Sequence, residues 1–163
     1  MYIKEIISLI EDYAPLKFQA SFDNSGLLCG NPEQELTSIL LCIDITEEVI
    51  KEAIDKGHNL IISHHPLIFS GLKHITPATY VERCVIDAIK HDITIYAAHT
   101  NMDVVANGVS GRMADKLDLY HRQVLQPEGD PMAGNGFGII GKLQQPVESM
   151  AFLQQVKEIV NQK

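Results

Sequence analysis

The sequence predicts a mixed α/β fold with a mostly parallel sheet and flanking helices. Three short apolar segments, 39–43, 60–63 and 93–98, alternate with two stretches in which apolar residues recur at helical spacing. A strand–helix–strand–helix–strand order of this kind gives parallel strands that are buried on both faces. The chain has 163 residues, 45% of them hydrophobic, which is enough for one such core.

The N-terminal region is predicted to form a helix followed by a turn and a short strand. Four isoleucines between positions 3 and 10 recur at helical spacing, and Pro15 ends the helix. Residues 22–30 are typical of a turn that leads into a strand. Within them, Asp23 either serves a functional site or closes an Asx-turn, and its residue type alone favours the turn.

Helix signals separate the three apolar segments. Thr46 is a suitable N-cap for the first helix, and Gly57 is a suitable stop. The Thr76-Pro77 pair opens the second helix, since proline is favoured in the first helical turn. Asn107-Gly108 precedes a further helix after the third strand.

The C-terminal region is predicted to begin a second α/β unit. Residues 126–136 are rich in proline and glycine and are predicted to form a loop. Residues 137–143 are typical of a strand, and apolar residues between 150 and 160 indicate a helix. The predicted organisation is therefore an N-terminal α/β unit (1–125), a loop (126–136) and the first strand and helix of a second, incomplete unit (137–163).

Composition limits the partners and the compartment. The formal net charge of −8 disfavours nucleic acid as a partner, and no apolar run approaches the roughly 20 residues that cross a membrane. The three cysteines, Cys29, Cys42 and Cys84, lie far apart, which argues against a disulfide framework and fits a reducing compartment. The N-terminal helix pattern carries charges that a signal peptide lacks. The expected location is cytoplasmic.

Histidines and a carboxylate follow two of the predicted strands. His64 and His65 come directly after segment 60–63, while His99 and Asp103 follow segment 93–98. The carboxyl ends of parallel strands meet at one sheet edge, and imidazole and carboxylate are common metal ligands. Successive side chains of an extended segment point in opposite directions, so the two adjacent histidines suit two ions better than one. Histidines are often structural or merely exposed, but this pattern favours a metal or catalytic site.

Other catalytic motifs are absent from the sequence. Ser63 and Thr100 adjoin histidines, yet no G-x-S-x-G elbow occurs, which disfavours acyl transfer. No Walker A sequence is present, and the glycine-rich segment 134–138 precedes a predicted strand rather than a helix, which is the wrong context for a phosphate-binding loop. Among metals that imidazole and carboxylate suit, zinc is expected, with iron, manganese and nickel as alternatives.

Three motifs together resemble those of a known family. They are Asp23-Asn24-Ser25-Gly26-Leu27-Leu28, the double-histidine segment 61–69 with its Ser63-His64-His65-Pro66, and segment 96–103, which runs from Tyr96 through His99 to Asp103. In this order they resemble the type 2 GTP cyclohydrolase I family, also called the Nif-three-like dinuclear-metal proteins.

The resemblance implies a Nif-three-like fold of two similar, intertwined halves, of which this chain holds the N-terminal half and the start of the second. It implies a ring-shaped homohexamer with two divalent metal ions per subunit. His64 and His65 would ligate different ions, Asp103 would ligate one of them, and His99 would lie beside them as a candidate catalytic residue. The family name implies hydrolytic opening of the GTP imidazole ring, or hydrolysis of a related nucleotide or phosphoester. The alternative is a metal-binding regulatory or interaction protein without turnover.

Two departures from the family pattern affect these expectations. Phe22 stands where tryptophan is frequent. The motif near the family's C-terminus, a histidine followed four residues later by a metal-bridging glutamate, has no match in this sequence. The resemblance therefore implies a truncated member that binds metal weakly and has little hydrolase activity.

Overall fold

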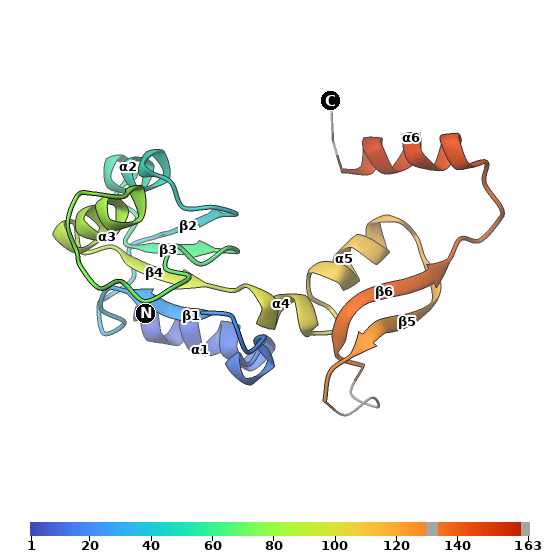
Figure 1. Ribbon diagram of the computed structural model, residues 1–163, viewed down its shortest axis with the longest axis horizontal. Coiled ribbons are helices and arrows are strands. Elements are labelled where there is room, and N and C mark those ends of the chain that lie inside the picture. The colour runs from blue at the N-terminus through green and yellow to red at the C-terminus, as the bar shows by residue number, and fades with distance from the viewer. Residues whose placement is uncertain (130–133, 161–163) are drawn as a thin grey trace. The chain divides into compact units, whose positions relative to one another are not determined.

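The computed structural model describes residues 1–129 and 134–160 (Figure 1). The chain divides into two compact units, Met1–Met102 and Asp103–Lys163. The sequence placed the change of unit later, within residues 126–136. The difference arises because the segment before that loop is a strand that pairs with the strand after it.

The first unit is built on a four-stranded sheet of order β1-β4-β3-β2. Strands β2, β3 and β4 run parallel to one another, and β1 is antiparallel to β4. The mostly parallel sheet predicted from the continuous apolar runs is therefore confirmed. The strands are β1 (Gly26–Cys29), β2 (Ile39–Cys42), β3 (Leu60–Ser63) and β4 (Thr94–Ala97).

Helices cover both faces of this sheet. In Figure 1, α2 and α3 lie on one face and α1 lies on the other. Each face has its own apolar cluster, one around Ile61 and Ile95 and one around Leu60 and Tyr96. Burial on both faces is what a parallel sheet requires. The helices are α1 (Ile3–Tyr13), the 3₁₀ turn η1 (Leu16–Phe18), α2 (Glu47–Lys56) and α3 (Tyr80–Lys90).

The helix signals read from the sequence are present at both ends of α2. The Thr46 side chain accepts a hydrogen bond from the backbone N–H of Val49. Gly57 ends the helix at φ 72°, a left-handed conformation that glycine adopts without steric cost. These two residues fix where α2 begins and ends, and so fix the loops that connect it to β2 and β3.

The second unit contains a helix, a two-stranded antiparallel sheet and a further helix. The strand and helix predicted near positions 137–143 and 150–160 are confirmed as β6 and α6. Strand β5 was not predicted, since most of its side chains are exposed and carry no strand-like alternation. The elements are α5 (Val109–Lys116), β5 (Tyr120–Pro127), β6 (Gly136–Lys142) and α6 (Ser149–Ile159).

Gly136 allows β5 and β6 to approach each other. Its φ is 151°, and a Cβ atom there would lie 2.2 Å from the carbonyl oxygen of Gln126. Only a residue without a side chain fits so close to a partner strand. Among the described residues, no helix combines the length and the apolar character that crossing a bilayer requires.

Candidate metal centre

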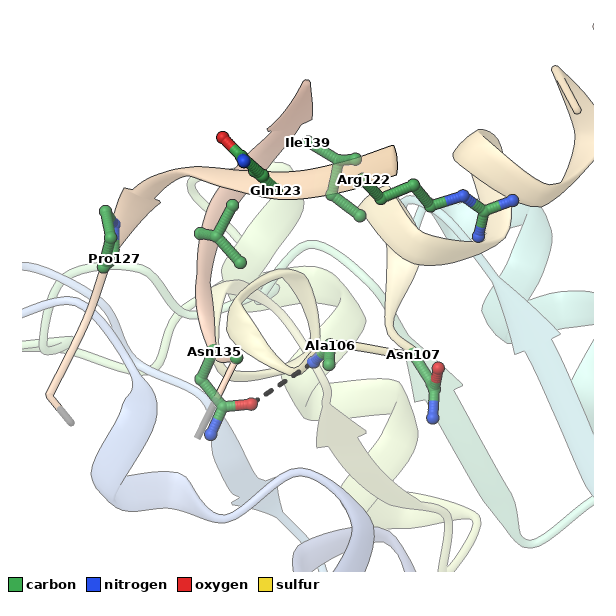
Figure 2. Close-up of a pocket in the computed structure, with 9 residues that line it drawn as sticks. Ala106, Asn107, Arg122, Gln123, Pro127, Asn135 and Ile139 are labelled. Atoms are coloured by element: carbon green, nitrogen blue, oxygen red, sulfur yellow. Dashed lines mark hydrogen bonds between the residues drawn. The ribbon is translucent and has the colours of Figure 1, made fainter. Parts of the chain in front are cut away.

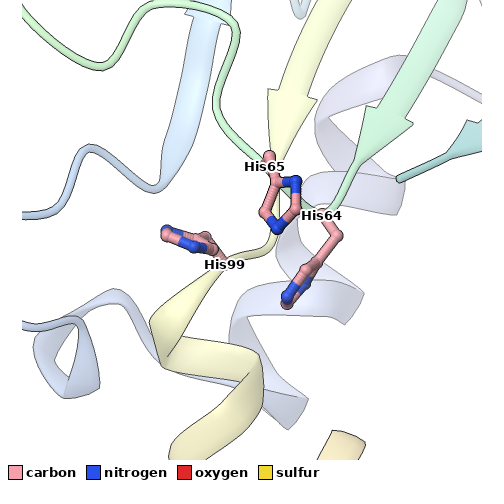
Figure 3. Close-up of side chains that lie close together, drawn as sticks. All are labelled: His64, His65 and His99. Carbon is pink, nitrogen blue, oxygen red and sulfur yellow. The ribbon is translucent and has the colours of Figure 1, made fainter. Parts of the chain in front are cut away.

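Three histidine side chains converge at the carboxyl edge of the parallel sheet (Figure 3). One ring nitrogen from each of His64, His65 and His99 lies within 4.8 Å of those of the other two. The ring centroids are 5.0, 5.3 and 5.5 Å apart, taken pairwise. Two histidines follow β3 and the third follows β4, and these strands are neighbours in the sheet. The sequence had placed all three at this site.

The two adjacent histidines point to the same side, contrary to the expectation that they would diverge. In a regular parallel strand only alternate residues donate hydrogen bonds to the same neighbour. Here the backbone N–H of His64 donates to Cys42 and that of His65 donates to Ile43, at 3.1 and 2.9 Å. The regular alternation has ended at Ser63, so both imidazoles reach one space.

Each of the three imidazoles is held by a hydrogen bond at Nδ1. The Nδ1 of His64 lies 2.9 Å from the carbonyl oxygen of Ala98. Those of His65 and His99 lie 2.7 and 2.8 Å from carboxylate oxygens of Asp44 and Asp23. All three partners are acceptors, so Nδ1 donates in each case, and the lone pair of a neutral ring lies on Nε2. Metal-ligating histidines typically have their second nitrogen oriented in this way.

Asp23 connects His99 to the rest of the first unit. Its side chain has no exposed surface, and it accepts hydrogen bonds from the His99 ring, the Ser25 hydroxyl and the backbone and hydroxyl of Thr100. It also accepts from the Asn24 backbone, so the Asx-turn favoured by the sequence and a role in the site are both present. Burial alone would raise the pKa of Asp23, but these hydrogen bonds outweigh it and hold the pKa well below its usual range.

The segment after His99 is helical. Helix α4 (Thr100–Val104) starts where Asp23 accepts the backbone N–H of Thr100, and a carboxylate there favours a helix start. Asn101 is consequently buried, and its amide donates to the carbonyl oxygen of Ala14 at 2.7 Å. Asp103 lies in this helix as the first residue of the second unit. Its role as a ligand stays a prediction.

The donor set fits a divalent metal ion. Two nitrogens bound to one tetrahedral zinc ion at about 2.0–2.1 Å lie about 3.4 Å apart. The separations of up to 4.8 Å between His64, His65 and His99 require a small inward adjustment to share one ion, or allow two. Three imidazoles with oriented Nδ1 atoms suit zinc, iron, nickel or manganese. The residues present therefore fit the metal that their pattern in the sequence predicts.

The cysteines do not contribute to this group. Cys42 and Cys84 pack against or within the core cluster between the sheet and helices α2 and α3. Burial raises the pKa of both thiols to about 11, so each is a neutral thiol at physiological pH. Both side chains therefore act as small core residues.

Asp44 is a site residue that the sequence analysis missed. It follows β2, the third parallel strand of the same edge, and its carboxylate orients His65. The available signal was its position, because a carboxylate directly after an apolar strand lies at the same sheet edge as the histidines.

A cavity lies within the second unit (Figure 2). It encloses about 490 Å³ and is lined by several amide side chains, including Asn135, whose Oδ1 accepts a hydrogen bond from the backbone of Ala106. Arg122 lines it, but its guanidinium donates to Asp115 and to the carbonyl oxygens of Leu119 and Ala114. With its cation engaged and no histidine among the described residues that line it, this cavity shows no comparable set of metal ligands.

Comparison with known proteins supports a family assignment. A sequence model of the Duf34/NIF3 family (NGG1p interacting factor 3) matches residues 1–163. The chain belongs to the Duf34/NIF3 family. Its relatives include a protein of Clostridium perfringens called GTP cyclohydrolase 1 type 2 homolog, 36% identical over the whole chain. The protein of the same name from Bacillus subtilis is 40% identical over 124 residues.

The chain is shorter than these family members. It spans 62% of the Clostridium perfringens relative and 33% of the Bacillus subtilis one. A Bacillus cereus protein related to NIF3 has a TM-score of 0.74 and 42% identity, with coverage of 79% of this chain and 36% of that one. Reduced HcgD from Methanocaldococcus jannaschii has a TM-score of 0.82 and 29% identity, covering 97% of this chain and 60% of its own. These solved structures confirm the Nif-three-like fold.

Proposed function

We propose that His64, His65 and His99 bind a divalent metal ion, zinc in the first place, as part of a metal-dependent hydrolase that acts on GTP or a related nucleotide or phosphoester. The supporting observation is the convergence of three imidazoles whose Nδ1 atoms are all held by acceptors. Hydrogen bonds that fix the orientation of every imidazole in a cluster are common in metal sites. The substrate class comes from the names of the relatives.

The residues of the site have distinct roles in this proposal. A bound divalent ion supplies Lewis acidity to the substrate. His64 and His65 ligate the ion in this proposal, and Asp103 is a candidate oxygen ligand on the strength of its motif. Asp44 and Asp23 keep the Nε2 atoms of His65 and His99 aimed at the shared space. His99 is the less exposed of the two imidazoles that a carboxylate holds, with 18% of its side chain accessible. In this proposal it either ligates the ion or exchanges a proton with the substrate.

The proposal includes a cytoplasmic homo-oligomer, a hexamer in its complete form, with a nucleotide as its small-molecule partner. The second candidate is a metal-binding regulatory protein without turnover. One observation favours this second candidate. Both carboxylates next to the histidines, Asp23 and Asp44, already hold imidazoles, so neither is free to act as a general base in hydrolysis. Size-exclusion light scattering measures the assembly, and turnover separates the two functions.

The test combines metal content with hydrolysis. Metal-stripped protein is titrated with Zn²⁺ or Mn²⁺ by calorimetry and then assayed with GTP and with p-nitrophenyl phosphate. His99→Ala is expected to lower both affinity and turnover, whereas His74→Ala, a change at an exposed histidine outside the group, should leave both unchanged. Metal binding without turnover would favour the regulatory candidate, and loss of neither property in His99→Ala would refute the proposed site.

A further inference from the structure

A cavity in the first unit opens beside the histidine cluster and shares a residue with it. It encloses about 340 Å³, within the range of roughly 300–1,000 Å³ typical of small-molecule pockets. Its walls come from the loop between β2 and α2, from the loop after β3 and from the start of α3. The lining residues are Asp44, Ile45, Thr46, His65, Pro66, Leu67 and Tyr80.

The apolar part of the lining suits a flat ring. Ile45 and Leu67 are 4% and 6% exposed and form a buried, rigid part of the wall. His65, Pro66 and Tyr80 each contribute a ring, and the ring of Tyr80 is half-exposed. Aromatic walls favour planar ligands because stacked rings bury area on both faces without needing a particular hydrogen-bond pattern.

The charges around the cavity disfavour an anionic ligand. Among the described residues that line it, Asp44 is the permanent charge, and no lysine or arginine contributes. Glu47 and Glu48 follow immediately in the first turn of α2. The nearby cation of α3, Arg83, donates two hydrogen bonds to Glu47 and a third to the carbonyl oxygen of Pro77. A phosphate or carboxylate placed here would therefore meet negative charge.

The hydrogen-bonding groups of the lining select donors on the ligand. The Thr46 hydroxyl accepts the helix-capping hydrogen bond from Val49, so it is engaged. The carboxylate of Asp44 has two acceptor oxygens, and His65 contacts one of them. A ligand with neighbouring N–H groups can pair with this carboxylate, whereas a ligand with carbonyl oxygens at that edge cannot.

We propose that this cavity binds an uncharged planar heterocycle with two adjacent N–H donors, and that it orients this ring beside the histidine cluster. The choice of an uncharged ring over a cationic one rests on the proposed function, because a divalent ion held by His65 would repel a cationic ring. The selection for a donor edge and against an anion rests on the cavity alone. The cavity would thus receive the heterocyclic end of the substrate and leave any phosphate outside.

The test uses nucleosides as probes and starts with metal-free protein. Guanosine presents two adjacent N–H donors on one edge, whereas uridine presents one donor between two carbonyl oxygens. Calorimetry should detect guanosine binding that is at least about tenfold tighter than uridine binding, since a bidentate pair discriminates by roughly that factor. Guanosine 5′-monophosphate should bind the metal-free protein no more tightly than guanosine.

Variants assign the binding to the cavity. Asp44→Asn should weaken guanosine binding about tenfold, while Asp55→Asn, which makes the same charge change at the other end of α2, should not. Tyr80→Ala should weaken it at least fivefold, and Tyr80→Phe, which keeps the ring, should bind like the wild type. Circular dichroism checks the fold, and all three positions are exposed enough for substitution.

The outcomes separate this inference from the proposed function. Guanosine binding in protein that takes up no metal would support the cavity and refute the metal site. Metal binding at the histidines with equal affinities for guanosine and uridine, or with no effect of Asp44→Asn, would overturn the cavity assignment and leave the metal site intact. Tighter binding of the monophosphate by metal-free protein would also overturn it.

Discussion

Replacing Asp23 by asparagine should both destabilise the first unit and weaken metal binding. The two carboxylate oxygens each accept a backbone N–H, one from Asn24 at 2.6 Å and one from Thr100 at 3.1 Å. An amide at this position has one oxygen and one NH₂ group. Whichever way it turns, its NH₂ group faces one of these two N–H donors, so at least one donor in a buried network loses its acceptor.

The expected loss of stability follows from the number of donors that lose their acceptor. One unsatisfied buried donor costs about 1–3 kcal/mol, and exchanging an ionised acceptor for a neutral one costs about a further 1 kcal/mol. The free energy of unfolding should fall by about 2–4 kcal/mol, which for a chain of this size lowers Tm by about 5–15 °C. If the NH₂ group faces His99, the Nδ1 atom of His99 must accept a hydrogen bond. The ring proton then lies on Nε2, which can no longer ligate a metal ion. The affinity for Zn²⁺ should then fall about 10- to 100-fold.

The assay is urea unfolding followed by circular dichroism, together with calorimetric titration of metal-stripped protein with Zn²⁺. Asp44→Asn is the matched control, because this carboxylate also holds an imidazole but is 66% exposed. It should change the free energy of unfolding by less than about 1 kcal/mol while still weakening metal binding. Wild-type stability and wild-type affinity in Asp23→Asn would refute the reasoning.

Three further predictions concern ligands, thiols and pH. His64→Ala and His65→Ala should each lower the metal content measured by elemental analysis with circular dichroism unchanged, and full metal retention in both would contradict their role as ligands. Cys42→Ser should cost about 1–2 kcal/mol of stability, since a half-buried thiol becomes a hydroxyl, and should not alter metal content; the reverse pattern would identify a thiolate ligand. Because folding lowers the pKa of Asp23 below its ordinary value of 3.8, its contribution to stability is present above about pH 4 and is lost as the pH falls further. Urea titrations should therefore show a larger loss between pH 6 and pH 3 for the wild type than for Asp23→Asn, and equal losses would contradict this assignment.

The sequence predicted the sheet because its parallel strands are short apolar runs. Strands β3 and β4 are buried, as such runs indicate, whereas the edge strand β2 leaves Leu41 exposed. Local patterns determine three further features. They are the sequence of strands β2, β3 and β4 along the chain, the ends of α2, and the location of His64, His65 and His99 at one sheet edge. These patterns are readable from neighbouring residues, since caps, stops and strand ends are set within a few positions. Strand β5 depends instead on pairing with β6, and its exposed residues give no local signal.

The detailed geometry of the site depends on contacts between distant segments. Asp23 lies 76 residues before His99 and 77 before Thr100, so nothing near Asp23 indicates that it orients an imidazole and starts a helix. The convergence of His64 and His65 likewise depends on two consecutive hydrogen bonds to the end of β2. A periodicity argument assumes regular strands, and it fails where the strand ends.

The proposal that His64, His65 and His99 bind one zinc ion together can be checked by X-ray absorption spectroscopy of the zinc-loaded protein. We expect a first shell with about three imidazole nitrogens at about 2.0–2.1 Å, including the outer-shell scattering that imidazole rings produce. In His74→Ala this spectrum should be unchanged, whereas in His99→Ala one imidazole should be lost. A shell of sulfur at about 2.3 Å, or a shell of oxygen without imidazole scattering, would contradict the claim.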